Sequence, residues 1–237
     1  MKKTLLVAAA TLAVGSFASQ AQVYSQNIVG YYNVSLTGNQ FALLSGQLLN
    51  SDGSNSVNNV LGSGLTSQSA LALFWDPSSS TFTTYTYYNA ADASPSPGGF
   101  YDINGNLSTN LFAPGKGAFI QDPNNTTITV VGTVPQGGST NTVGVGFNIY
   151  SINAPISTNI DSGLVNFPAT SQQDQLLLWT GSSYNPYTYY NDADAGGPGL
   201  GGWYDINGNL APYPTVGSAF FIEHFGSTAT WTNSFSF

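Results

Sequence analysis

The sequence predicts an all-β protein of two tandem, pseudo-symmetric units, each a small β-sandwich or a partly open barrel, packed against each other. The first observation is a heptapeptide, Tyr-Asp-Ile-Asn-Gly-Asn-Leu, which starts at Tyr101 and is repeated letter for letter from Tyr204. The second is that short runs of β-branched and aromatic residues, separated by turn residues, recur without helical periodicity. The third is composition: aromatic residues make up 14% of the chain and charged residues 6%, which suits a packed core and not a disordered chain.

The first 21 residues predict a cleaved signal helix, a secretory signal peptide that precedes the two units. Lys2 and Lys3 lead into an apolar run at residues 4–17, and Ser19 and Ala21 stand at the small-residue positions before a cleavage site. No later apolar run approaches the ~20 residues of a membrane helix. The mature chain is therefore expected to be secreted or extracytoplasmic, in the periplasm or at the cell surface, and not embedded in a membrane. Repeat 1 is then residues 22–135, and repeat 2 is residues 136–237.

The elements of repeat 1 follow from its apolar runs and turn residues. Strands are predicted at residues 28–36, 41–49, 71–75, 81–88, 118–120 and 126–134. Ser56 is a suitable N-cap for a single helical turn at residues 57–61. Turn chemistry from Asp76 to Ser80 joins two of the strands into a hairpin. The Asn104-Gly105 pair of the heptapeptide predicts a tight hairpin turn, because both residues tolerate a positive φ.

Repeat 2 follows the same order with small changes in loop length. Its strands are expected at residues 147–156, 176–179, 187–191, 219–222 and 230–237. The strand at residues 126–134 also resembles the start of repeat 1. We therefore interpret it as a strand that finishes the first unit and begins the second, with the boundary at Gln136 to Ser139.

The charge of the chain limits the classes of partner. After the signal peptide, Lys116 is the one basic residue, against 11 acidic residues. Nucleic-acid binding is excluded, because it requires several Lys or Arg side chains to displace counterions from phosphates, and anionic lipid is disfavoured for the same reason. The absence of cysteine excludes disulfides, thiolate nucleophiles and cysteine metal sites.

The heptapeptides alternate oxygen-bearing side chains in the manner of a calcium loop. They depart from the EF-hand pattern, because the sixth position is leucine and the twelfth is Ala113 or Val216 instead of glutamate. Two interpretations stay open: a tight turn whose side chains bond to the backbone, and a calcium site that recruits aspartates of the preceding loop. The candidate calcium ligands are Asp92, Asp102, Asn104 and Asn106 in repeat 1, and Asp192, Asp194, Asp205, Asn207 and Asn209 in repeat 2. No other cofactor is predicted.

Aromatic residues beside Asn and Asp are typical of sugar recognition, since apolar sugar faces stack on rings while hydroxyls bond to amides and carboxylates. The candidate carbohydrate-binding residues are Tyr87, Tyr88, Phe100 and Tyr101 in repeat 1, and Tyr189, Tyr190, Trp203 and Tyr204 in repeat 2. The competing interpretation is that these rings form the core and the cross-strand pairs of an aromatic-rich sheet.

No catalytic constellation is predicted, and the protein is not expected to be an enzyme. His224 is the only histidine, and its counterpart in repeat 1 is Asp122, so a Ser-His-Asp triad has no support. A glycosidase needs a pair of carboxylates, for which the repeat-related choice is Asp102 with Asp205. Aspartates are common in turns, however, and the pattern alone does not favour catalysis.

Four stretches carry a resemblance to a group of uncharacterised secreted bacterial proteins with two tandem β repeats. They are an Ile-Val-Gly-Tyr start, a Pro-Gly-x-Gly-x-Phe-Ile strand with its second copy, and an Ala-Thr-Trp-Thr-x-x-Phe ending, at residues 28–31, 114–120, 216–222 and 229–237. Ala118 departs from the aromatic residue usual there, and Thr215-Val216 replaces Pro-Gly. The resemblance implies secretion and the tandem fold, and it implies no activity.

Three functions are compatible with the sequence. The first is a non-enzymatic β protein with a structural or adhesive role outside the cytoplasm, whose partners are polysaccharide or other cell-surface proteins. The second is a carbohydrate-binding module that uses the tyrosine-rich strands and the Asp/Gly loops. The third, less favoured, is a glycosidase. The oligomeric state is left open.

Overall fold

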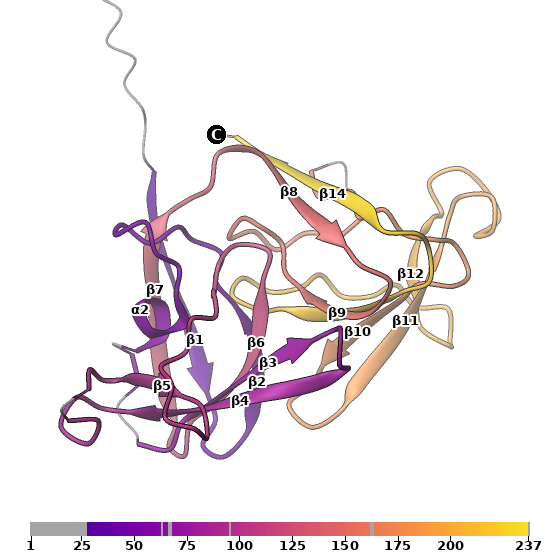
Figure 1. Ribbon diagram of the computed structural model, residues 1–237. Helices are drawn as coiled ribbons and strands as arrows, with labels where there is room; N and C mark the ends of the chain where they lie inside the picture. The colour runs from indigo at the N-terminus through magenta and orange to yellow at the C-terminus, as the bar shows by residue number, and fades with distance from the viewer. Residues whose placement is uncertain (1–27, 63, 66–67, 95, 162–163, 237) are drawn as a thin grey trace, which may run out of the picture.

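The computed structural model describes residues 28–236 except residues 63, 66–67, 95 and 162–163, and the chain is nearly all-β, as predicted (Figure 1). The predicted signal peptide lies outside the described residues. The first half of the molecule contains β1 (Val29–Leu36), β2 (Phe41–Ser45), α2 (Val57–Leu61), β3 (Leu71–Asp76), β4 (Thr81–Tyr88), β5 (Gly99–Tyr101), β6 (Gly117–Gln121) and β7 (Thr126–Thr133). The second half contains β8 (Gly137–Val143), β9 (Gly146–Tyr150), β10 (Gln175–Trp179), β11 (Tyr184–Tyr190), β12 (Gly202–Tyr204), β13 (Phe220–His224) and β14 (Ala229–Phe235).

The strands form four antiparallel sheets. One half has a five-stranded sheet in the order β5-β4-β3-β6-β2 and a two-stranded sheet of β1 and β7. The other half has the order β12-β11-β10-β13-β9 and a two-stranded sheet of β14 and β8. The two five-stranded sheets therefore have the same strand order when each label is raised by seven. Within the part of the chain described, no helix has the length and apolar character that a membrane crossing requires.

The core lies in three layers between the sheets, which explains why several strands are apolar at every position. Alternate residues of a strand face opposite sides of its sheet. In β3, Ala72 and Phe74 pack in the cluster between the first five-stranded sheet and β1-β7, whereas Leu73 and Trp75 pack in the cluster between the two five-stranded sheets. A third cluster, around Trp231, fills the second half. Of the two predicted architectures, the sandwich, in which sheets pack face to face over a core, describes this arrangement.

Three sequence-based boundaries differ from the structure. The strand interpreted as shared, residues 126–134, is β7 and pairs with β1 of the first half along its whole length, whereas the second half has a strand of its own, β8, which pairs with β14. Sequence reasoning missed β8 because only Val143 in it is buried and the rest of it is polar. The predicted strands at 41–49 and 147–156 end early, at Ser45 and Tyr150. Gly46 comes so close to the backbone of Phe112 that a Cβ atom would lie 1.9 Å from its carbonyl oxygen, and the chain leaves the sheet there.

The two halves meet in a reciprocal contact, which we call the junction. The indole nitrogen of Trp75 donates to the carbonyl oxygen of Phe147 at 2.7 Å, and that of Trp179 donates to the carbonyl oxygen of Phe41, also at 2.7 Å. Backbone bonds are exchanged in the same way, from Ser45 N to Gly217 O (2.9 Å) and from Ser151 N to Gly115 O (3.3 Å). Each half thus presents the same surface to the other, as in a two-fold dimer interface.

Candidate functional site

Each heptapeptide folds into a turn that is organised by its own aspartate. Oδ1 of Asp102 accepts bonds from the backbone N–H groups of Asn104 (2.9 Å) and Asn106 (2.8 Å), and Oδ2 accepts one from the Asn106 amide (2.9 Å). These bonds, first of all that from the Asn106 side chain, lower the pKa of Asp102. Of the Asn104-Gly105 pair only Gly105 has a positive φ (80°), so the turn ends in a single left-handed glycine and not in two such residues.

The second heptapeptide has the same geometry. Oδ1 of Asp205 accepts bonds from Asn207 N (2.9 Å) and Asn209 N (2.8 Å), and Oδ2 accepts one from the Asn209 amide (3.0 Å). Bonding from Asn209 again lowers the pKa of the aspartate. Both loops therefore have the tight-turn geometry in which the side chains bond to the loop itself.

The other candidate calcium ligands of repeat 2 also accept bonds from the protein, Asp192 from its own loop and Asp194 from a distant serine. Asp192 accepts a bond from Gly201 N (2.8 Å), and backbone N–H groups of Gly199 and Gly201 lower its pKa. Asp194 accepts one from the hydroxyl of Ser171. Among the described residues, no three His, Asp or Glu side chains come together to hold a metal ion. A calcium site that uses the asparagine oxygens stays a prediction.

Three of the eight candidate sugar-binding rings belong to the core clusters, and a fourth, Tyr101, is also buried, at 9% exposed. Tyr87 is buried and donates its hydroxyl to Gly62 O (2.9 Å), and its ring packs against that of Phe100 with centroids 5.4 Å apart. Phe100 is 0% exposed and Trp203 is 1% exposed, and Trp203 packs against Tyr189 at 5.3 Å. For Tyr87, Phe100 and Trp203 the core interpretation holds, because these rings are packed inside the core clusters of the two halves.

Of the five remaining rings, Tyr189 packs against the core of the second half, and the other four form one tyrosine pair in each half. Tyr88 and Tyr101 meet edge to face with centroids 6.1 Å apart, and so do Tyr190 and Tyr204, at the same distance. Tyr101 donates its hydroxyl to Pro97 O, and Tyr204 donates its hydroxyl to Leu200 O. Tyr88 is 41% exposed, so its ring offers a surface to solvent.

The tyrosine pair of the first half lines a cavity of about 580 Å³, which we call the Tyr88 cavity. It brings together two predicted sugar-binding tyrosines and two predicted calcium ligands; its lining includes Thr84, Thr86, Tyr88, Asp92, Tyr101 and Asp102. The three β4 residues, Thr84, Thr86 and Tyr88, share a face because they alternate along the strand. Asn89 fixes the following loop, since its Oδ1 accepts the N–H of Ala91 (2.9 Å) and of Asp92 (3.0 Å).

The repeat-related carboxylates do not form a glycosidase pair. Asp102 follows β5 and Asp205 follows β12, and Figure 1 places these strands on opposite sides of the molecule. The lowered pKa of Asp102 is also opposite to what a general acid requires.

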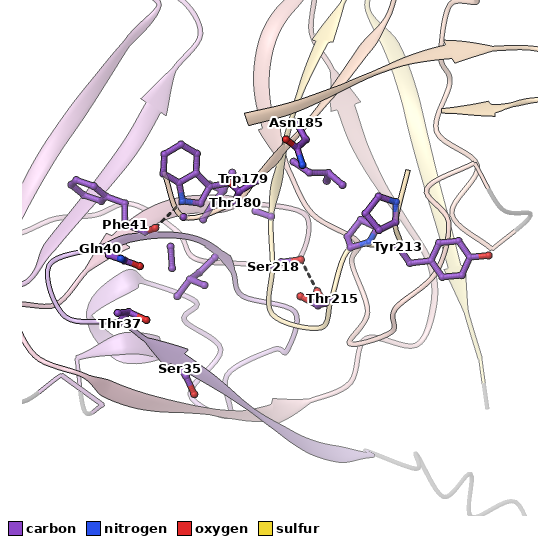
Figure 2. A pocket seen from close by; sticks show the side chains of 18 of the residues that line it. Ser35, Thr37, Gln40, Phe41, Trp179, Thr180, Asn185, Tyr213, Thr215 and Ser218 are labelled. Atoms are coloured by element: carbon purple, nitrogen blue, oxygen red, sulfur yellow. Dashed lines mark hydrogen bonds between the residues drawn. The ribbon is translucent and has the colours of Figure 1, made fainter. Parts of the chain in front are cut away.

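A second cavity, which the sequence did not indicate, opens at the junction and is called here the junction groove. Its volume is about 480 Å³, and no charged residue lines it. Figure 2 shows the side chains of Gln40, Phe41, Trp179 and Ser218 around it. The side-chain amides of Gln40 and Asn185 are among the polar groups that line it. Its residues come from three distant stretches of the chain, so no local motif predicts it.

The only histidine belongs to the core. Nδ1 of His224 lies 2.6 Å from Oδ2 of Asp174, and Nε2 lies 3.0 Å from the carbonyl oxygen of Ser227. Asp174 also accepts the backbone N–H groups of Thr170 (2.9 Å) and Phe225 (2.8 Å). With His224 2% exposed and Asp174 0% exposed, the pair holds the end of β13 and has no access to a substrate.

Comparisons with known proteins gave no match to a family model, to a curated protein or to a solved structure. The resemblance to secreted two-repeat proteins stays a prediction.

Proposed function

We propose that this protein is a non-enzymatic, extracytoplasmic β protein that binds neutral polysaccharide through its tyrosine pairs and thereby serves in adhesion or in surface structure. The observation that carries the proposal is the Tyr88 cavity. An exposed aromatic ring there stands beside hydroxyl and carboxylate oxygens, the combination that stacks on a sugar ring and bonds to its hydroxyls.

The chemistry of the Tyr88 cavity favours an uncharged sugar. Asp92 and Asp102 are its charged lining residues, and neither Lys nor Arg lines it. A ligand that carries a carboxylate or a phosphate would face two like charges there. Sugar hydroxyls, by contrast, donate bonds to carboxylates.

The position of the two tyrosine pairs supports an adhesive role. Tyr88-Tyr101 follows β4 and β5, and Tyr190-Tyr204 follows the equivalent strands β11 and β12 on the opposite side of the molecule (Figure 1). Two sites that face apart can engage two polymer chains or two points of one surface. Linked sites of this kind raise apparent affinity by about 10²–10⁴ on a polyvalent ligand.

A polysaccharide pull-down with single and double variants tests the proposal. The purified protein is expected to bind one or more neutral polymers, such as cellulose, xylan or mannan. Tyr88→Ala and Tyr190→Ala should each weaken the retention, and the double variant should lose it. The loss should be about 3–10-fold per ring for a single soluble ligand, since aromatic contacts contribute about 0.5–1.5 kcal/mol.

The control is Tyr31→Ala, which removes a still more exposed tyrosine (74%) from β1, outside the cavity. It should bind as the wild type does. Retention by no neutral polymer, or equal loss in the control and in the tyrosine-pair variants, would contradict the proposal.

A further inference from the structure

The junction contains a second groove that is the structural counterpart of the first. Its volume is about 290 Å³, at the lower end of ligand cavities, and its lining includes Trp75, Asn110, Lys116, Thr142 and Asn148. Trp75 stands in it as Trp179 stands in the junction groove, and each indole makes the same bond to the other half. We call it the Lys116 groove.

One substitution changes the charge of this groove. Lys116 stands where the junction groove has Ser218, which Figure 2 shows at the edge of that groove. Both residues follow a glycine in the left-handed region, Gly115 with φ 84° and Gly217 with φ 82°, so the backbone positions correspond. The same scaffold therefore carries a hydroxyl in one groove and an ammonium group in the other.

The ammonium group of Lys116 has no carboxylate partner. The salt bridge between His224 and Asp174 is the only one found among the described residues, and no Asp or Glu lines the Lys116 groove. Asp76 lies in the chain between two residues that line the groove, Trp75 and Pro77, but its carboxylate accepts bonds from Ser78 and Ser79. An unpaired cation at a cavity in a protein of net charge −8 is a specific position for an anion.

The neighbours of Lys116 suit a ligand that also carries hydroxyl groups. The Asn148 amide donates to the carbonyl oxygens of Gly144 (3.0 Å) and Gly146 (3.2 Å), which leaves its own oxygen free to accept a bond. Thr142 adds a hydroxyl, and Trp75 adds an aromatic ring. A carboxylate for the lysine and hydroxyls for the amide and the threonine occur together in a uronic acid.

We propose that the Lys116 groove binds a uronate unit of an acidic saccharide. The site is separate from the Tyr88 cavity in residues and opposite to it in charge, so one protein would hold neutral and acidic polymers at different places. An ammonium–carboxylate bond is charge-assisted and roughly twice as strong as a neutral one, which makes Lys116 the residue that decides the ligand.

Calorimetric titration of the purified protein with trigalacturonate tests this, with galactotriose and acetate as the comparison ligands. Trigalacturonate should bind, and its affinity should fall as salt is raised. Lys116→Ser, which copies the other groove, should weaken binding at least tenfold, whereas Lys116→Arg should keep it within a few-fold. Ser218→Lys, the converse change, should add a second uronate site to the junction groove.

Several outcomes would overturn the inference: no uronate binding by the folded wild type, unchanged binding in Lys116→Ser, or acetate binding as tightly as the trisaccharide. The Tyr88→Ala variant should bind trigalacturonate normally. The Tyr88 and Tyr190 variants test binding of neutral polymers, and the Lys116 variants test binding of uronate. Either proposal can therefore be refuted while the other stands.

Discussion

Replacing Asp174 by alanine should destabilise the second half of the molecule strongly. The carboxylate accepts three bonds, from the His224 ring and from the backbone N–H groups of Thr170 and Phe225, and it is 0% exposed. Alanine would leave all three donors buried without an acceptor. Water cannot replace the lost oxygen atoms unless the structure around β13 opens.

The magnitude follows from the cost of removing one partner from a buried, hydrogen-bonded pair that contains an ionisable group, which is about 3–5 kcal/mol. Whole domains are stable by only about 5–15 kcal/mol, so this is a large part of the total. For a chain of this size, 1 kcal/mol corresponds to about 2–4 °C in melting temperature, and the expected fall is about 6–20 °C. The double variant Asp174→Ala/His224→Ala should recover part of the loss, because it removes the unpaired ring, with a coupling of about 1–3 kcal/mol.

The assay is urea unfolding followed by tryptophan fluorescence, with the melting temperature measured by circular dichroism. Asp76→Ala is the control, since that aspartate also accepts three bonds but stands partly exposed at the end of β3, and it should shift the midpoint little. A melting temperature of Asp174→Ala within 2 °C of the control would correspond to a loss of about 1 kcal/mol or less. That result would refute the prediction that burial makes the loss of this carboxylate costly.

Two further predictions concern the junction and the pH dependence of stability. Trp179→Phe removes the bond to the Phe41 carbonyl and should lower the free energy of unfolding by about 1–2 kcal/mol in urea titrations. Trp75→Phe should lower it less, since the bond from Trp75 to Phe147 is more exposed. Equal urea midpoints for the wild type and Trp179→Phe would contradict this prediction. Burial raises the pKa of Asp161, so its proton is held more tightly in the folded than in the unfolded chain, and its contribution to stability is lost as pH rises from about 3.9 through the folded pKa. Asp161→Asn should therefore be slightly more stable than the wild type at pH 7 and equal to it below about pH 4 in urea midpoints, and a gap that grew toward low pH would reverse the sign.

Local patterns in the sequence determined the strand content, the capped turn at α2 and the hairpin of β3 and β4. Ser56 accepts the N–H of Asn59, and β3 pairs with β4 across the predicted turn. These features depend on neighbours within a few residues, and the residue types alone carry them. The repeated heptapeptide likewise specified two identical turns, because each turn is closed by bonds from its own aspartate.

Which aromatic residues are free was decided only by tertiary structure. Tyr87 and Tyr88 are adjacent and identical in type, yet one is core and the other lines a cavity. Alternation shows that neighbours face opposite sides of a sheet, but it does not say which side is covered when both are apolar. The two faces of the first five-stranded sheet are covered by β1 and β7 on one side and by the other five-stranded sheet on the other, and these segments are distant in sequence.

The two grooves at the junction depend on tertiary structure in the same way. Lys116 is visible in the sequence as the one Lys or Arg after Lys3, but Asn148 and Thr142 line the same groove only because the halves pack reciprocally. The sequence fixes which chemical groups exist and how each strand is folded locally. Long-range packing decides which of these groups meet, because contacts between distant segments arise from the shape and burial of whole sheets and leave no local pattern to read.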